Sequence, residues 1–469
     1  MKLKSLTWAI LLIGLPTTGV FAAAMDRSGQ SIAAFLQPNN YFEGGISVLD
    51  ANVSGNMRNG WNMPSNDTAK SGADLSNSHL DDMAESFYFA NFALKYQVNE
   101  NVSMGLIYDQ PFGAKAAYSA NDLKHQTSPT SSPLFGGDDA LKAGAFHNDG
   151  EGTKVEVDTQ SLSLIMGYQP NEHWNIYAGP VYQTVKGDVS LRGSVYGPLG
   201  GFMCSDKIGT VLCSTFKDKE TGQPIKGYDA SIAEKSEFGY LAGIAFQIPE
   251  IALKTSLTYR SEIDYKVDVK ETMPVANNFL IGIAVPALTE NFIYTSGKTN
   301  ITTPQSINLD FQSGIMENTL AFVNLRWVDW SKFSIRPHKF GQLASGLTQA
   351  VAGTPRGFDL VAYDKDQYSV NFGIARKLNE KVALSLLGGW DSGAGNPVST
   401  LGPTEGFWSA GLGGQYSPTP ATFIQAGARY FWLGDAKAQS ASWFGTERYD
   451  ADFKDNTAIG YSLKIGYKF

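Results

Sequence analysis

The last eleven residues of the chain, I-G-Y-S-L-K-I-G-Y-K-F, alternate between two kinds of side chain over positions 459–469. Every odd position is apolar and every even position is Gly, Ser or Lys. A period of two predicts a β-strand with two unlike faces. Aromatic residues lie toward both ends of the apolar face, which is typical of a strand that meets lipid between two interfacial girdles. The alternative is an edge strand of a soluble sandwich, which can show the same pattern by chance.

Residues 1–24 have the organisation of a secretory signal peptide. Lys2 and Lys4 precede an apolar run over positions 6–15, and small residues follow at 20–24. We expect cleavage after Ala22 or Ala24. The run is too short for a membrane anchor, and no other stretch approaches the roughly 18 consecutive apolar residues of a spanning helix. The mature protein is therefore either soluble beyond the inner membrane or crosses a bilayer as strands.

The composition favours one large β-structured unit. The 469 residues contain no Pro- or Ser-rich linker, and they include 49 Gly, 21 Tyr, 27 Phe and 9 Trp but only 17% charged residues. Aromatic residues favour strands. The formal net charge is −8, and loss of the two lysines of the signal gives −10. A chain this acidic is not expected to bind nucleic acid.

Strand candidates come in pairs, each joined by a very short turn. The six turns are expected at positions 97–101, 169–173, 247–250, 316–318, 378–381 and 417–420. Their Asn, Pro and Glu residues favour tight reversals. With a first strand at 41–50 and the last strand, about fourteen strands result, and seven long connections separate the pairs. This pattern predicts an all-β, transmembrane antiparallel barrel over residues 41–469, preceded by a short luminal plug over residues 25–40.

We assign the apolar face of each strand to lipid. The opposite face carries many charges, so it is expected to line a lumen that contains water and not to contact the hydrocarbon layer. The stretches 86–98 and 421–432 alternate in this way. In the stretch 252–269 one lipid-facing set is expected, formed by Leu253, Leu257, Tyr259, Ile263, Tyr265, Val267 and Val269.

The opposite face is predicted to line the lumen, and it carries both aromatic and polar side chains. The set comprises Phe87, Phe89, Phe322, Phe407, Phe423, Phe431, Asn91, Asn324, Arg326, Gln425 and Arg429. Arg260, opposite the apolar face of its strand, adds a further cation. Phenylalanines beside a few cations suit a mostly apolar ligand with one anionic group. The alternative is that the phenylalanines pack against a plug or an inward loop.

An apolar run interrupts the fourth long connection. The predicted ligand-capturing residues are Phe279, Leu280, Ile281, Ile283, Val285 and Leu288. Exposed apolar patches usually mark interaction sites, although a short helix packed on the barrel rim could carry the same run.

The third strand runs into Pro111, Phe112 and Gly113. Proline cannot donate a hydrogen bond to a neighbouring strand, so pairing is expected to fail there. A lateral opening in the barrel wall could follow.

Cys204 and Cys213 are the two cysteines, and in an exported protein they are predicted to form a disulfide. Two thiolates with no histidine nearby in sequence make an incomplete metal site. The pairs Asp81-Asp82 and Asp138-Asp139 could hold Ca²⁺, but the simpler interpretation is that these carboxylates are solvated at the surface. We therefore expect neither a cofactor nor a metal.

The five histidines fall in predicted loops or a turn, with no nucleophile at a strand end beside them. This arrangement argues against a barrel enzyme. A transport protein and a general water-filled porin remain.

Three stretches make the chain resemble the FadL/TodX family of outer-membrane transporters for hydrophobic compounds. They are F-E-G-G-I-S-V-L-D-A-N-V-S-G at 42–55, L-T-Y-R-S-E-I-D-Y-K-V at 257–267 and D-W-S-K-F at 329–333. The resemblance implies a monomeric fourteen-stranded barrel with an N-terminal plug and lateral release of cargo at a kink in the third strand. It also implies an arginine near the loop end of the fifth strand, where Arg192 lies.

The expected function is passive uptake of hydrophobic molecules across the outer membrane of a Gram-negative bacterium. Long-chain fatty acids are the first candidate cargo; aromatic hydrocarbons, other hydrophobic compounds or a general porin are the alternatives. Expected partners are the cargo, membrane lipids and lipopolysaccharide, and the barrel assembly machinery, which in this class of protein reads a C-terminal aromatic such as Phe469.

Overall fold

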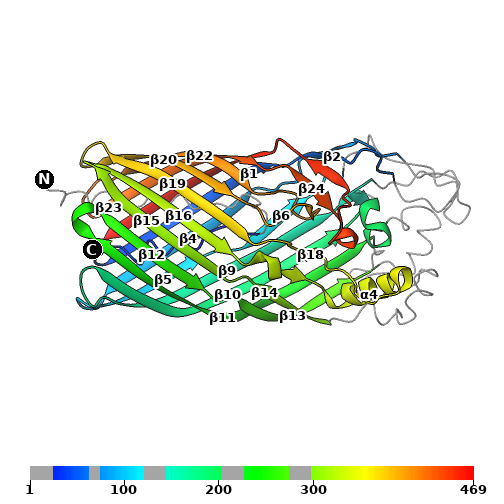
Figure 1. Ribbon diagram of the computed structural model, residues 1–469, viewed down its shortest axis with the longest axis horizontal. Coiled ribbons are helices and arrows are strands. Elements are labelled where there is room, and N and C mark those ends of the chain that lie inside the picture. The colour runs from blue at the N-terminus through cyan, green and yellow to red at the C-terminus, as the bar shows by residue number, and fades with distance from the viewer. Residues whose placement is uncertain (1–24, 63–73, 121–143, 149, 202–225, 274–296) are drawn as a thin grey trace, which may run out of the picture.

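The structure is a computed structural model, and it describes residues 25–469 except 63–73, 121–143, 149, 202–225 and 274–296. Its main feature is a closed antiparallel β-barrel of 14 strands (Figure 1), which confirms the predicted fold class. The barrel closes where the first strand, β1, pairs with the last, β26.

Seventeen segments build the barrel sheet. The segments are β1 (Tyr41–Asn52), β4 (Phe87–Gln97), β5 (Val102–Asp109), β6 (Gly113–Ala117), β9 (Lys154–Tyr168), β10 (Trp174–Leu191), β11 (Tyr228–Ile248), β12 (Leu253–Arg260), β13 (Ile263–Thr272), β14 (Gly297–Thr303), β15 (Ser306–Met316), β16 (Thr319–Val328), β19 (Gln367–Lys377), β20 (Val382–Asp391), β22 (Phe407–Tyr416), β23 (Thr422–Leu433) and β26 (Thr457–Lys468). Three barrel strands are interrupted and consist of two segments each, namely β5 with β6, β12 with β13, and β14 with β15.

All six predicted short turns join neighbouring strands at the end of the barrel that also holds the C-terminus (Figure 1). The long connections lie at the opposite end, which is the extracellular end in bacterial barrels of this pattern. There they carry the small strands β2 (Gly55–Met57), β3 (His79–Leu80), β7 (His147–Asn148), β8 (Glu151–Gly152), β17 (Ser334–Ile335), β18 (Val361–Ala362), β21 (Val398–Ser399), β24 (Ala436–Gln439) and β25 (Ala451–Phe453), together with the 3₁₀ turns η4 (Ser194–Gly200), η6 (Trp330–Lys332) and η7 (Ala441–Trp443).

The described residues include one α-helix, α4 (His338–Ala352), and a 3₁₀ turn between β11 and β12, η5 (Pro249–Ile251). Of the helices in these described ranges, none is both long enough and apolar enough to span a membrane.

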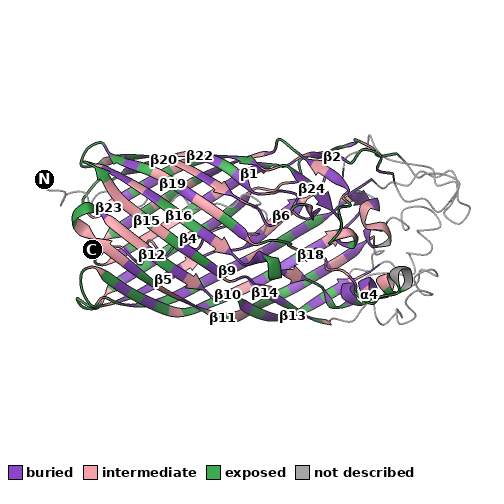
Figure 2. Cartoon of the chain, viewed as in Figure 1, coloured by how far each residue is buried: buried purple, intermediate pink, exposed green. Residues whose placement is uncertain are grey.

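The outward face of the barrel is apolar where the sequence predicts contact with lipid. In β26, the side chains of Tyr461, Leu463 and Ile465 are 50%, 47% and 56% exposed. Figure 2 shows exposed and buried residues alternating along the strands. The predicted assignment of faces in this strand is therefore confirmed.

The same prediction is wrong for the second half of the seventh strand. Leu257 in β12 points outward, but Ile263, Tyr265, Val267 and Val269 in β13 are buried inside the barrel. The reversal occurs at the two residues that separate β12 from β13, where Ser261 both donates to and accepts from the backbone of Tyr240. An irregularity of this kind changes which face a side chain occupies.

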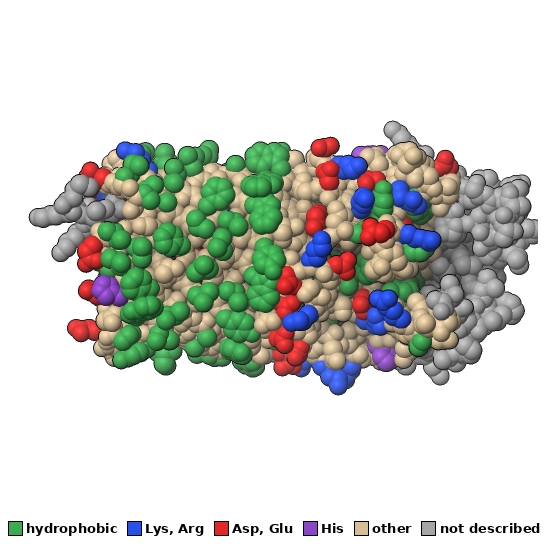
Figure 3. Space-filling model, viewed as in Figure 1, with side chains coloured by type: hydrophobic (Ala, Val, Ile, Leu, Met, Phe, Trp, Pro, Cys, Tyr) green, Lys and Arg blue, Asp and Glu red, His purple; other side chains and the backbone are tan. Residues whose placement is uncertain are grey.

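The reversal places four charged side chains of β13 outside the barrel, whereas Glu271 near its end is buried. The exposed set comprises Asp264, Lys266, Asp268 and Lys270, and Glu262 just before β13 is exposed too. Figure 3 shows hydrophobic side chains over the half of the wall nearer the short turns, with charged side chains beyond this band. A wall that continues past the hydrocarbon layer has water outside it, so its outer face is polar and its interior apolar.

Residues 25–40 lie inside the barrel and pack against its wall. Ile32 and Phe35 are each only 1% exposed, and the Phe35 ring lies 5.7 Å from that of Tyr177. Gly105 and Gly167 leave room for this ring, because a Cβ atom at either position would collide with it. We call residues 25–40 the plug.

We predict that Leu463→Arg destabilises the barrel by about 2–4 kcal/mol, because it places a charge against the hydrocarbon layer. Asp264→Arg, on the charged part of the outer face, is the control and should cost about 0–1 kcal/mol. Urea unfolding of the protein in lipid vesicles measures both values. Equal losses of stability would contradict the assigned membrane band.

Candidate functional site

The wall of the barrel is interrupted between β4 and the third strand. β5 ends at Asp109 and β6 begins at Gly113, with Pro111 between them. The ladder between β4 and β5 extends only to the pair Phe92–Tyr108, and within the described residues the β4 segment 87–91 has no ladder partner on this side. We call this interruption the wall gap.

The beginning of the plug lies against the wall gap and pairs with its broken strand. The Arg27 amide donates to the Pro111 carbonyl at 2.7 Å, and the Gly113 amide donates to the Met25 carbonyl at 2.8 Å. The Arg27 guanidinium lies 4.1 Å from the centre of the Phe87 ring and forms an ion pair of 3.2 Å with Asp158. The plug therefore satisfies backbone groups that the kink removes from the ladder.

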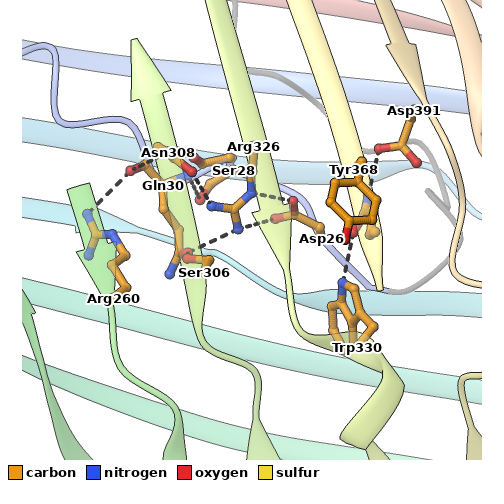
Figure 4. A network of polar contacts seen from close by, with 12 residues as sticks. Asp26, Ser28, Gln30, Arg260, Ser306, Asn308, Arg326, Trp330, Tyr368 and Asp391 are labelled. Atoms are coloured by element: carbon orange, nitrogen blue, oxygen red, sulfur yellow. Dashed lines mark hydrogen bonds and ion pairs between the residues drawn. The ribbon is translucent and has the colours of Figure 1, made fainter. Parts of the chain in front are cut away.

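A buried ion pair holds the plug to the opposite part of the wall (Figure 4). Arg326 donates from Nε to Asp26 Oδ2 at 2.7 Å and from Nη2 to Asp26 Oδ1 at 3.1 Å. The same guanidinium also donates to Asn308 Oδ1 at 2.8 Å and Gln30 Oε1 at 3.0 Å. The two charged side chains are only 2% and 8% exposed, so this pair is shielded from water.

Further polar contacts extend this network along the plug. Ser28 Oγ donates to Asp109 Oδ2 at 2.9 Å, and Arg260 donates to the Gln30 carbonyl at 3.4 Å and to Ser163 Oγ at 3.1 Å. These bonds fix the plug between strands that are far apart in the sequence.

Two lysines hold the other end of the plug near the short turns. Lys95 Nζ donates to the Gln37 carbonyl and Lys254 Nζ donates to the Leu36 carbonyl, both at 2.6 Å. The plug is thus fixed at both ends.

One cavity, which we call the lower cavity, lies beside the plug and has an empty volume of about 1270 Å³, including space open to the surroundings. Phe89, Phe322 and Arg429 line it from inside the barrel. Phe92 and Tyr108 line it too, although Phe92 is exposed on the outer face and the pair marks the end of the β4–β5 ladder. The cavity therefore extends to the end of the β4–β5 ladder, next to the wall gap.

A second cavity, the upper cavity, has an empty volume of about 740 Å³ and touches both Met25 and Gly113. Its walls come from β9, β10 and β11, and the segments 335–363 and 399–404 cover it. No charged side chain is present among the described residues that line it. An apolar solute can enter such a space without desolvating an ion.

Glu405 lies directly after the segment that covers the upper cavity. Burial raises the pKa of its carboxyl group to about 8, although the Gly395 amide donates to Oε1 and partly opposes the shift. Burial therefore favours the protonated form of this carboxyl group.

The structure places the other predicted site residues in different surroundings. Phe87 lies under Arg27, and Phe431 packs edge-on against Phe407 at 5.2 Å. Arg192 is bound by Glu151 at 3.0 Å and Asp229 at 2.9 Å, so carboxylates of the protein already occupy it. Ligand binding by these residues stays a prediction, as does a lateral opening at Pro111, Phe112 and Gly113.

Several predicted residues lie outside the described ranges, and their roles also stay predictions. They are the signal peptide 1–24, the capture residues Phe279, Leu280, Ile281, Ile283, Val285 and Leu288, the cysteines Cys204 and Cys213, and the acidic pair Asp138-Asp139.

Sequence analysis did not identify Asp26 and Arg27 as site residues. Their partners Arg326 and Asp158 lie 300 and 131 positions away. No local periodicity carries such a signal; the one available hint was a pair of opposite charges immediately after the predicted signal peptide.

We predict that Asp26→Asn loosens the plug, because breaking a buried ion pair costs about 3–5 kcal/mol. Hydrogen exchange of the plug amides should accelerate at least tenfold while the barrel strands remain protected. Asp452→Asn, which breaks the more exposed 3.7 Å pair with Lys454, is the matched control and should leave the plug unchanged. Unaltered plug exchange in Asp26→Asn would show that the ion pair does not hold it.

Comparisons with solved structures give the same fold at low sequence identity. A Pseudomonas aeruginosa FadL homologue is 14% identical, with a TM-score of 0.61 over 93% of this chain and 92% of that one. The P. putida toluene transporter TodX is 10% identical, with a TM-score of 0.51 over 93% and 91%. The Ralstonia pickettii toluene transporter TbuX is 11% identical, with a TM-score of 0.51 over 99% of both chains.

No curated protein matches the sequence. A family model does match, over residues 142–469, and it describes outer membrane transport proteins of the OMPP1/FadL/TodX type. This match and the closed barrel confirm the predicted location in the Gram-negative outer membrane. The chain belongs to the outer membrane protein transport protein family (OMPP1/FadL/TodX).

Proposed function

We propose that the protein carries long-chain fatty acids passively into the outer membrane, binds them in its lumen and releases them sideways through the wall gap. The single observation that supports this route is the lining of the lower cavity. Phe89 and Phe322 face the lumen, whereas Phe92 faces lipid, and all three border the same space. A solute in this cavity would lie next to the wall gap, and release through that gap would take it into lipid without passing through water.

The apolar run at residues 279–288 would capture cargo at the extracellular end. From there the upper cavity offers a lining without charged side chains among the described residues, and it meets the plug at Met25. Since Met25 also accepts a hydrogen bond from Gly113 of the kink, a movement of this plug end would change both the upper cavity and the wall gap.

The route needs no energy source. Transfer of an acyl chain from water to an apolar site gains about 0.8 kcal/mol per CH₂ group. Release into lipid keeps this gain, whereas release into the aqueous periplasm would lose it. Cargo can therefore run down its gradient by binding and release alone.

A neutral aromatic hydrocarbon is the second candidate cargo. The absence of charged side chains from the described lining of the upper cavity favours it. The solved toluene transporters TodX and TbuX share the fold. Parallel uptake assays with labelled oleate and labelled toluene separate the two cargoes. A large, steady conductance in a planar bilayer would instead support a general porin.

We predict that Ala90→Trp slows uptake of labelled oleate by roughly tenfold, because its indole would fill the outer mouth of the wall gap. Ala90 is exposed and lines the lower cavity. Ala426→Trp is the matched control. This exposed alanine belongs to β23, which is paired with β22 on one side and with β26 on the other. Uptake by the control should equal that of the unmodified protein.

Cells that carry an empty vector set the baseline for this assay. Uptake by the unmodified protein no greater than this baseline would rule out the proposed transport. Unchanged uptake by Ala90→Trp would instead rule out the lateral route while leaving transport itself in place.

A further inference from the structure

We propose that Arg429 binds the acidic head group of an amphiphilic cargo, a carboxylate, in the lower cavity. This inference rests on the proposed function and narrows it. The sequence predicts four arginines as candidate contacts for an anionic ligand, namely Arg192, Arg260, Arg326 and Arg429. The ion pairs and hydrogen bonds of each arginine in the folded protein select one of them.

Arg429 is buried but has only neutral hydrogen-bond partners among the described residues. Nε and Nη2 donate to Ser409 Oγ at 3.1 and 2.7 Å, and Nη2 also donates to Asn371 Oδ1 at 2.7 Å. The residue is 5% exposed, and its guanidinium carbon lies 5.2 Å from the centre of the Phe431 ring. The side chain is therefore held in place without a counter-charge.

Three other buried arginines of the described chain are already neutralised. Arg27, Arg192 and Arg326 each form an ion pair with a carboxylate within 4.0 Å. Arg260 has no such pair, but it lies in the field of Asp109 and donates to a plug carbonyl. No described carboxylate lies within ion-pair distance of Arg429. Burial of an unpaired cation costs several kcal/mol, which an anionic ligand would offset.

The acidic groups that also line the lower cavity are engaged elsewhere. Glu43 accepts from Lys464 at 2.9 Å and from Tyr41. Asp109 accepts from Ser28, and Asp310 accepts from Asn324 and Ser256. The guanidinium of Arg429 is thus the described cation of this cavity that remains without an acidic partner.

The shape of the site suits an amphiphile. Nη1 of Arg429 makes no hydrogen bond with the described residues, which leaves it available to a ligand oxygen. Phe89 and Phe322 border the same cavity and can cover an acyl chain, and the cavity continues to the wall gap. A bound fatty acid would place its carboxylate at Arg429 and its tail toward lipid.

The test compares dodecanoate with dodecanol, which has the same chain and no charge. Binding to the purified protein in lipid nanodiscs is measured at pH 8 for the unmodified protein, Arg429→Gln and Arg429→Lys. We expect Arg429→Gln to weaken the binding of dodecanoate about tenfold to a hundredfold, which is the range for loss of a charge-assisted hydrogen bond. The affinity for dodecanol should change less than about twofold. The affinity of Arg429→Lys for dodecanoate should lie between those of the unmodified protein and Arg429→Gln.

Arg376→Gln is the matched control, because Arg376 is exposed near the short turns and lies outside the cavity. Equal dodecanoate affinity in Arg429→Gln and the unmodified protein would overturn the assignment. Loss of both ligands in Arg429→Gln would also overturn it, because it would indicate a structural role. Failure of the unmodified protein to bind either ligand would contradict the proposed function itself.

Discussion

The structure depends on one requirement, which is that backbone N–H and C=O groups at membrane depth find partners within the protein. A closed barrel meets this requirement by pairing the first strand with the last. Pro111 breaks it locally in the third strand, and the plug supplies backbone partners for Pro111 and Gly113 through Met25 and Arg27. The wall gap and the plug therefore depend on each other, since the plug pairs with the broken strand at the gap.

Buried charges add to the apolar packing of the plug. Ile32 and Phe35 pack against the wall, and ion pairs and hydrogen bonds to the plug backbone also fix its position. Arg326 holds one end through Asp26, while Lys95 and Lys254 hold the other through carbonyl groups. These bonds are directional, so they hold the plug in a defined position.

Much of the fold could be predicted from the sequence because a barrel strand repeats every two residues. The outward face of β26 followed from that period, and the strand count followed from the short turns with their Asn, Pro and Glu residues. The period also caused the error in β13, since a break at Ser261 reverses the faces without altering the apparent alternation. Local sequence patterns do not indicate which cations are neutralised, because pairs such as Arg326–Asp26 join residues 300 positions apart.

The most direct test of the lateral route is a crystal structure with a terminally brominated fatty acid, whose anomalous signal locates the end of the tail. The account predicts bromine at the wall gap, between β4 and the kink at Pro111, with the tail continuous with the lower cavity. Bromine on the barrel axis below the plug, past Lys95 and Lys254, would show that cargo leaves toward the periplasm and would contradict the account.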